Sequence, residues 1–212
     1  MMGSKLVGLL LAVLVLGCVS DAGTSALGAQ CRSVTAPTAV LGIVDGMDRL
    51  TSDAVEMGFM QSMVRFDAGA IGISKEAICK AGHPELRQFA QRVIDERSSE
   101  QERFFTWLLA QYGDDGIPSK RPMAGDWRTI GSIEPLCGCE FEVQYMLAMI
   151  SHDAGVLAVA SKAGQRSIHG RIGNAASGVA AQRSVDIARL QSWLLCWYGI
   201  EVTVVTPARC VC

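Results

Sequence analysis

Charged side chains interrupt the apolar stripes of this 212-residue sequence at matching places. Residues three and four apart share one face of a helix, and this spacing puts Asp67 and Asp153 among methionines, alanines and valine on two such faces. On two further stripes an arginine is followed three residues later by an acid. A buried charge without a partner costs several kcal/mol, so these groups must pair, bind a metal ion or reach water. The six positions are Asp67, Arg97, Glu100, Asp153, Arg183 and Asp186.

Sulfur and imidazole donors accompany these charges. Met149 and His152 are three residues apart and share a helix face, and thioether sulfur and imidazole nitrogen are donors that copper accepts. The sequence therefore predicts a copper site. Its candidate ligands are His152, Asp153, Asp67, Met146, Met149, Met60, Met63, Glu100 and Asp186.

A competing interpretation is a layer of interior salt bridges. Methionine at helical spacing more often fills a core than binds a metal ion. Arg97 and Arg183 would repel a cation, whereas each guanidinium is a good partner for a carboxylate. This interpretation predicts the pairs Asp67–Arg97 and Asp153–Arg183 and a structural or interaction module in which salt bridges replace the metal.

The chain repeats itself at a fixed offset. Trp107-Leu108-Leu109 recurs as Trp193-Leu194-Leu195, because 193 − 107 = 86, and Asp67-Ala68-Gly69 recurs as Asp153-Ala154-Gly155 at the same offset. From Asp53 to Gly113 there are 18 identities in 61 positions without a gap. Such self-similarity indicates a duplicated structural unit.

Each copy predicts a helical hairpin, over residues 53–113 and 140–199, with turns near positions 82–83 and 168–170. Residues 30–52 form an N-terminal extension, residues 114–139 a long crossover loop rich in Gly, Pro and Asp, and residues 200–212 an extended, cysteine-containing tail. We expect an all-α, ferritin-like four-helix bundle made of two repeated hairpins joined by the crossover loop. Asp67 lies 15.5 residues before the first turn and Arg97 lies 14.5 after it, so both should lie at mid-height.

The N-terminus has the layout of an export signal. Lys5 precedes the apolar run Leu6–Leu16, which is too short to cross a bilayer. We expect residues 1–29 to be a signal peptide or lipoprotein leader, with lipidation at Cys18 or cleavage after Ala22 or near Ala29 as alternatives. The protein should therefore be extracytoplasmic: secreted, periplasmic or membrane-anchored.

Seven cysteines remain beyond Cys18, and in an exported chain they predict a partial disulfide framework with at least one thiol left over. They are Cys31, Cys79, Cys137, Cys139, Cys196, Cys210 and Cys212. We expect Cys79 to pair near Cys137 or Cys139, because the crossover returns to the end of the bundle where the first helix finishes. The Cys137-Gly-Cys139 and Cys210-Val-Cys212 pairs could instead offer soft metal ligands, although disulfides are the commoner use.

Other functional classes lack support. A net charge of −2 gives no electrostatic footprint for nucleic acid or anionic membrane, so we expect membrane association only through a lipid at Cys18; protein partners are not predicted. No nucleophile–base pair, phosphate loop or dinucleotide fingerprint occurs, so we expect no enzyme. His83 and His169 read as polar caps at the two turns, and Glu56 and Glu142 as acids favoured by a helix N-terminus.

Three stretches resemble a known family: Phe59-Met60-Gln61-Ser62-Met63-Val64, His83-Pro84-Glu85-Leu86 through Gln91-Arg92-Val93-Ile94, and Glu100 followed by Trp107-Leu108. The family is the bacterial domain-of-unknown-function family 305, whose members are exported ferritin-like bundles, some associated with copper.

The family's most distinctive feature is a His-His pair in the first helix. Here the two positions hold Phe66-Asp67 in one copy and His152-Asp153 in the other, so the motifs are degenerate. Glu100, more loosely Asp186, and the methionines at 60, 63, 146 and 149 also match. The resemblance implies a copper-associated protein whose metal site has lost three of four histidines.

Overall fold

The computed structural model describes residues 30–35, 38–113 and 118–205. The predicted leader, with Cys18, and the end of the tail, with Cys210 and Cys212, lie outside these residues. In chain order the elements are β1 (Gln30–Thr35), α1 (Thr38–Met47), α2 (Ser52–Lys80), α3 (Pro84–Tyr112), α4 (Ala124–Ile133), α5 (Gly138–Arg166), α6 (Gly170–Tyr198) and β2 (Ile200–Val205).

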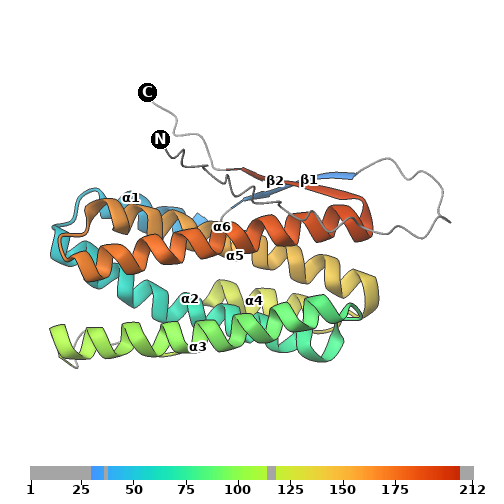
Figure 1. The fold of residues 1–212 in the computed structure, drawn as a ribbon, viewed down its shortest axis with the longest axis horizontal. Coiled ribbons are helices and arrows are strands. Elements are labelled where there is room, and N and C mark those ends of the chain that lie inside the picture. The colour runs from blue at the N-terminus through green and yellow to red at the C-terminus, as the bar shows by residue number, and fades with distance from the viewer. Residues whose placement is uncertain (1–29, 36–37, 114–117, 206–212) are drawn as a thin grey trace, which may run out of the picture.

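Two long antiparallel hairpins form the body of the molecule (Figure 1). One consists of α2 and α3 and the other of α5 and α6, and the hairpins meet where α2 packs on α5. Pro84 suits the first turn of α3, and glycines at 113 and 199, with positive φ, end α3 and α6. The predicted all-α four-helix bundle is confirmed.

The repeat extends beyond the hairpins. Adding 86 to the bounds of α1, α2 and α3 gives the bounds of α4, α5 and α6, for example 38 + 86 = 124 and 112 + 86 = 198. The leading helices are exchanged, because α1 packs on α5 while α4 packs on α2. The prediction that residues 114–139 are a loop is therefore wrong, since α4 occupies part of them, and α1 occupies part of the predicted extension.

Two glycines of α2 allow α4 to approach closely. A Cβ added at Gly69 would lie 2.5 Å from the carboxyl carbon of Asp126, and one at Gly72 would lie 2.8 Å from a methyl carbon of Ile130. Asp126 has little freedom to withdraw, because its Oδ2 accepts a 3.0 Å hydrogen bond from the backbone of Met123 at the start of α4.

We therefore expect Gly69→Ala to lower the free energy of unfolding by about 1–3 kcal/mol, the usual cost of overpacking. The matched control is Gly58→Ala in the same helix, where an added Cβ meets nothing within 4 Å. That change should stabilise α2 by about 0.5–1 kcal/mol, because alanine restricts the unfolded chain. Denaturant unfolding of both variants checks the pair, and a stabilising Gly69→Ala would contradict the close packing of α4.

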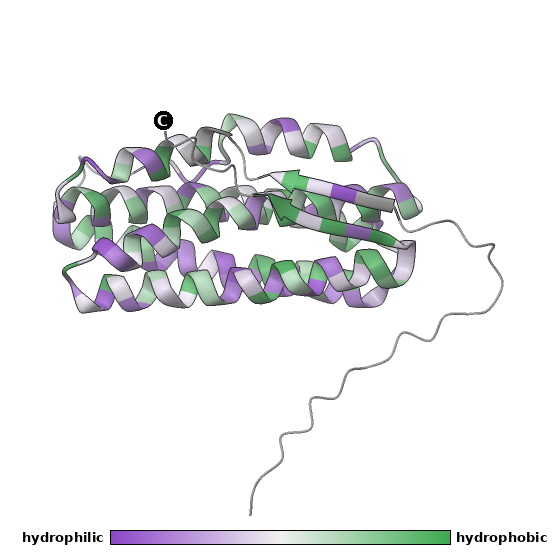
Figure 2. Ribbon diagram, turned by 90° about the horizontal axis from the view of Figure 1, so that it is seen from above, coloured by the Kyte–Doolittle hydropathy of each residue, from purple (hydrophilic) through white to green (hydrophobic). Residues whose placement is uncertain are grey.

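A two-stranded parallel sheet runs along the bundle beside α5 and α6 (Figure 2). Its register runs from Gln30 paired with Ile200 to Thr35 paired with Val205. The first part of the predicted extended tail forms β2, and β1 is its partner. Ile200 and Val202 are buried, so the sheet covers part of the core.

Buried apolar residues form two clusters, one toward each end of the bundle. One surrounds Phe89, Tyr145 and Leu190, and the other surrounds Phe59 and Phe104. Among the described helices, α5 alone is long and apolar enough to span a membrane, but 67% of its apolar window is buried, as expected for a core helix.

Candidate functional site

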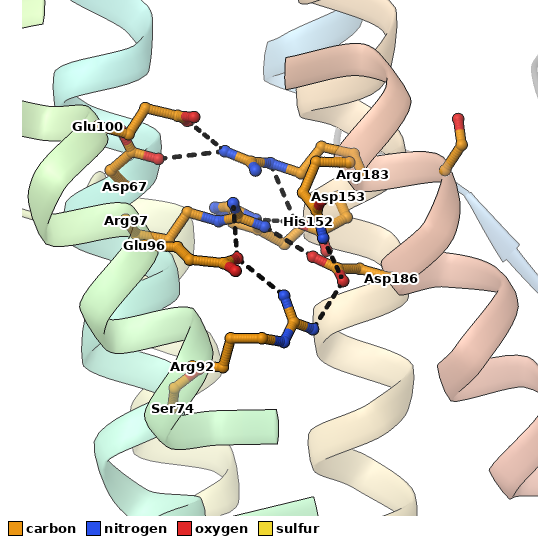
Figure 3. A network of polar contacts seen from close by, with 12 residues as sticks. Asp67, Ser74, Arg92, Glu96, Arg97, Glu100, His152, Asp153, Arg183 and Asp186 are labelled. Atoms are coloured by element: carbon orange, nitrogen blue, oxygen red, sulfur yellow. Dashed lines mark hydrogen bonds and ion pairs between the residues drawn. The ribbon is translucent and has the colours of Figure 1, made fainter. Parts of the chain in front are cut away.

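The six charged positions predicted from the stripes lie together between the two apolar clusters (Figure 3). We call them the charged layer: Asp67 of α2, Arg97 and Glu100 of α3, Asp153 of α5, and Arg183 and Asp186 of α6. All except Glu100 are buried, and the side chain of Glu100 is only 12% exposed. The prediction that carboxylates and guanidiniums face one another in the interior is confirmed.

The shortest ion pairs of the charged layer run between the two hairpins (Figure 3). Nη2 of Arg183 lies 2.5 Å from Oε1 of Glu100 and 3.3 Å from Oδ1 of Asp67. Nη2 of Arg97 lies 2.8 Å from Oδ2 of Asp186. Because 97 + 86 = 183 and 100 + 86 = 186, the pairs Arg97–Asp186 and Arg183–Glu100 are equivalent. Each hairpin thus donates an arginine to an acid of the other.

This arrangement corrects one predicted pair and weakens the other. Asp67 pairs with Arg183 instead of the predicted Arg97. The predicted Asp153–Arg183 pair is present but long, at 3.7 Å between Oδ1 and Nε. The backbones of α3 and α6 make at most sparse contact, so long arginine side chains bridge the two helices. Arg92, which lies outside the predicted inward stripe of its helix, adds a second contact to Asp186 at 2.8 Å.

The two equivalent aspartates have opposite electrostatic environments. Burial and the nearby Glu100 carboxylate raise the pKa of Asp67 well above its usual range, against the opposing effect of Arg183. Burial also opposes the charge of Asp153, but the hydrogen bond from His152 and the fields of Arg97 and Arg183 lower the pKa of that carboxyl. Asp153 is therefore easier to ionise than an ordinary aspartate, whereas Asp67 is harder to ionise.

Both ring nitrogens of His152 face oxygen atoms. Nε2 lies 3.0 Å from the backbone carbonyl oxygen of Phe66, and Nδ1 lies 3.3 Å from Oδ1 of Asp153. The carboxylate that would share a copper ion with Nδ1 already faces a cation, because Nε of Arg183 lies 3.7 Å from the same oxygen of Asp153. The charged layer as arranged does not fit a copper ion.

The four methionines are fully buried and divided between the two apolar clusters. Met60 and Met63 belong to one, and Met146 and Met149 to the other. This placement is typical of core filling.

One wall of the layer borders a groove of about 1130 Å³ between α2, α4, α5 and β1. His152 and Ser151 line it beside Asp126 and Arg65. His152 is therefore the point at which the interior layer meets a surface hollow, although it is only 8% exposed itself.

Reciprocal clasps close both ends of the bundle, and the sequence did not reveal them. Oε1 of Glu56 accepts from the backbone nitrogens of Ile168 and His169 at 2.8 Å, and its Oε2 lies 2.6 Å from Nδ1 of His169. Glu142 holds the other turn in the same way, through the backbone nitrogen and Nδ1 of His83. The available signal was the offset itself, because both the glutamates and the histidines are 86 residues apart.

Hydrogen bonding outweighs burial at Glu56 and lowers the pKa of this carboxyl, so its charged form stabilises the fold. This contribution should be present above about pH 4.5 and lost as the pH falls further. We expect Glu56→Gln to cost about 1.5–3 kcal/mol at neutral pH and to flatten the loss of stability in acid. Unfolding titrations between pH 3 and 7 measure both effects. Glu76→Gln, which breaks a half-buried surface pair with Lys80, is the control and should be nearly neutral.

The cysteines only partly follow the prediction. Cys79, Cys137 and Cys139 are free thiols with exposed side chains, so the expected pairing of Cys79 is not formed. The end of α2 does lie against the start of α5, because Lys80 donates to the carbonyl of Glu134 and lies 5.7 Å from the ring of Phe141. Cys196 is disulfide-bonded, and the side chain of Cys31 lies outside the described part.

Fold and site together define a duplicated all-α bundle with an ion-paired interior. The family model for the domain of unknown function DUF305 matches residues 35–108 and 118–205, one segment for each copy of the repeat. The chain belongs to the DUF305 family, as the resemblance predicted.

Solved structures share this fold. CopM in its Cu(II)-bound form has a TM-score of 0.60 at 20% identity, and in its Cu(I)-bound form 0.59 at 20% identity; each match covers 68% of this chain and 97% of CopM. A DUF305 protein from Streptomyces coelicolor, described as secreted, has a TM-score of 0.62 at 20% identity over 72% of this chain and 97% of its own. A search of curated proteins gave no match to the sequence.

Proposed function

We propose that this protein binds soft metal ions, copper in particular, outside the cytoplasm, as a non-catalytic member of its family, and that its donors are sulfur atoms rather than the charged layer. One observation carries the proposal. The acids of the charged layer and the neighbouring His152 already have polar partners, whereas Cys79, Cys137 and Cys139 are exposed and not in disulfides. Soft thiolates select Cu(I) over harder ions.

The comparisons and the leader support the same function. CopM, which shares the fold, has been solved with Cu(I), Cu(II) and silver bound. An extracytoplasmic location is supported by the apolar leader and by the secreted relative from Streptomyces coelicolor.

Metal titration tests this proposal. We expect purified, reduced protein to bind Cu(I) or Ag(I) more tightly than a generic surface site, and His152→Ala to bind equally well. Loss of binding in His152→Ala would place the ion in the charged layer instead. A matched apolar change that leaves the layer intact, Val156→Ala, controls for loosened packing.

A second candidate is a structural or interaction module without a metal ion. The reciprocal pairs Arg97–Asp186 and Arg183–Glu100 favour it, because they occupy the interior with charges that satisfy one another. Absence of any binding tighter than a generic surface site, for both copper oxidation states, would support this candidate and remove the first.

A further inference from the structure

Three free thiols gather at the end of the bundle where α2 finishes and α5 begins, which we call the thiol end. Cys137 and Cys139 flank Gly138 at the start of α5, and Cys79 lies in the last turn of α2. Lys80 in that turn contacts the carbonyl of Glu134 at the end of α4 and the ring of Phe141 in the first turn of α5.

The two repeats differ at Cys137 and Cys139 in a way that does not favour helix stability. Because 137 − 86 = 51 and 139 − 86 = 53, the equivalents of Cys137 and Cys139 are Thr51 and Asp53. Thr51 caps α2, with its side chain accepting from the backbone nitrogen of Ala54, and Asp53 is an acid in the first turn. Cys137 makes no side-chain cap hydrogen bond. The second copy thus lacks a side-chain N-cap hydrogen bond, which typically stabilises a helix by about 1 kcal/mol. Position 139 also lacks the acidic charge of Asp53, which the helix dipole favours.

The same positions bring metal-ligand atoms together at the opposite end of the bundle. There, ligand atoms of Asp53, Glu56 and His169 lie within 4.8 Å of one another. The equivalent positions at the thiol end hold Cys139, Glu142 and His83. Tyr198 contacts both Cys139 and Glu142 there. Cys139 therefore has a soft sulfur where its equivalent, Asp53, has a hard carboxylate oxygen. Asp53 lies beside two other possible metal ligands, Glu56 and His169.

We propose that Cys137 and Cys139 form a binding site for one soft monovalent ion, Cu(I) or Ag(I), held between two thiolates. This inference rests on the proposed function and locates the metal site at the start of α5. Gly138 has a φ of 56°, which glycine adopts without strain, so the backbone turns between the two thiols as the helix begins. Binding converts two thiols to thiolates, and two protons leave for each ion bound.

The experiment compares four reduced proteins under anaerobic conditions: the wild type, the double variant Cys137→Ser with Cys139→Ser, the control Cys79→Ser, and His152→Ala. Each is titrated with Cu(I) and with Ag(I) against a chromophoric chelator, and proton release is measured in weak buffer. Serine at position 137 supplies an oxygen able to cap α5, so the double variant should fold at least as well as the wild type. Circular dichroism and denaturant unfolding verify this.

We expect the double variant to lose at least about 100-fold in affinity, which exceeds the usual effect of removing a supporting group. Cys79→Ser and His152→Ala should bind as the wild type does, with two protons released per ion. Unchanged binding by the double variant, or an equal loss in Cys79→Ser, would overturn the two-thiol site. If binding disappears only in His152→Ala, the thiol site fails while metal binding stands, and if the wild type binds neither ion, the proposed function fails.

Discussion

Replacing Arg183 by methionine is expected to lower the free energy of unfolding by about 3–5 kcal/mol, the usual cost of removing one partner from a buried ion pair. A single guanidinium serves Glu100 at 2.5 Å, Asp67 at 3.3 Å and Asp153 at 3.7 Å, and its side chain is 1% exposed. Methionine fills a similar volume without a charge, so the variant would leave carboxylates of three helices facing one another. Urea unfolding of both proteins measures the difference.

The repeat provides a matched control in Arg97→Met. Its acid, Asp186, keeps Arg92 at 2.8 Å, so we expect a smaller cost of about 1–3 kcal/mol. The loss in free energy of unfolding should be larger for Arg183→Met than for Arg97→Met. This difference tests the role of Arg92, because the two arginines are equivalent in the repeat and equally buried. Equal losses would mean that Arg92 does not hold Asp186 in solution. A nearly neutral Arg183→Met would mean that water reaches the layer and screens its charges.

The charged layer was predictable from the sequence because a charge in an apolar stripe is a strong signal. Asp67 and Arg97 interrupt helices at nearly the same distance from a turn, and this sets their height in the bundle. Their partners could not be predicted in this way. Height is the same for both hairpins, and the choice of partner depends on an arginine reaching across from α3 to α6, which is a property of packing in three dimensions.

The leading helix of each repeat, α1 or α4, could not be recognised from the repeat because the two sequences differ there. No residue of α1 is identical to its equivalent in α4, so the offset of 86 gives no signal there. Both helices are placed by neighbours of the other hairpin, and in α4 by the gap that Gly69 and Gly72 leave on α2. Two glycines within a helix do not predict which segment of the chain will pack against them.

The clasps at the bundle ends were missed for a related reason. Glu56 and Glu142 lie in the first turns of their helices, where an acid is favoured by the helix dipole alone. The sequence therefore offers a sufficient local explanation for both. Their actual partners are turns of the opposite hairpin, 113 residues away for Glu56 and His169.

Asparagine at positions 67 and 153 should have opposite effects, although the sequence treats these two aspartates as equivalents. Burial and Glu100 raise the pKa of Asp67 well above its usual range, so ionising this carboxyl weakens the fold as the pH rises above about 3.8. Asp67→Asn removes that charge and should match or exceed the wild type in stability at pH 7. Denaturant unfolding at pH 7 and at pH 4 measures the effect, and the advantage of the variant should shrink at the lower pH.

Asp153→Asn should instead cost about 1.5–3 kcal/mol at pH 7, as expected when a charge-assisted hydrogen bond is lost. The hydrogen bond from His152 and the two arginines lower the pKa of Asp153 despite its burial, so its charged form stabilises the fold. That contribution should be present above about pH 3.8 and disappear as the pH falls through the lowered pKa, so the two proteins should converge in acid. Two variants with the same cost at every pH would contradict the asymmetry, because it arises from Glu100 lying beside one aspartate and His152 beside the other.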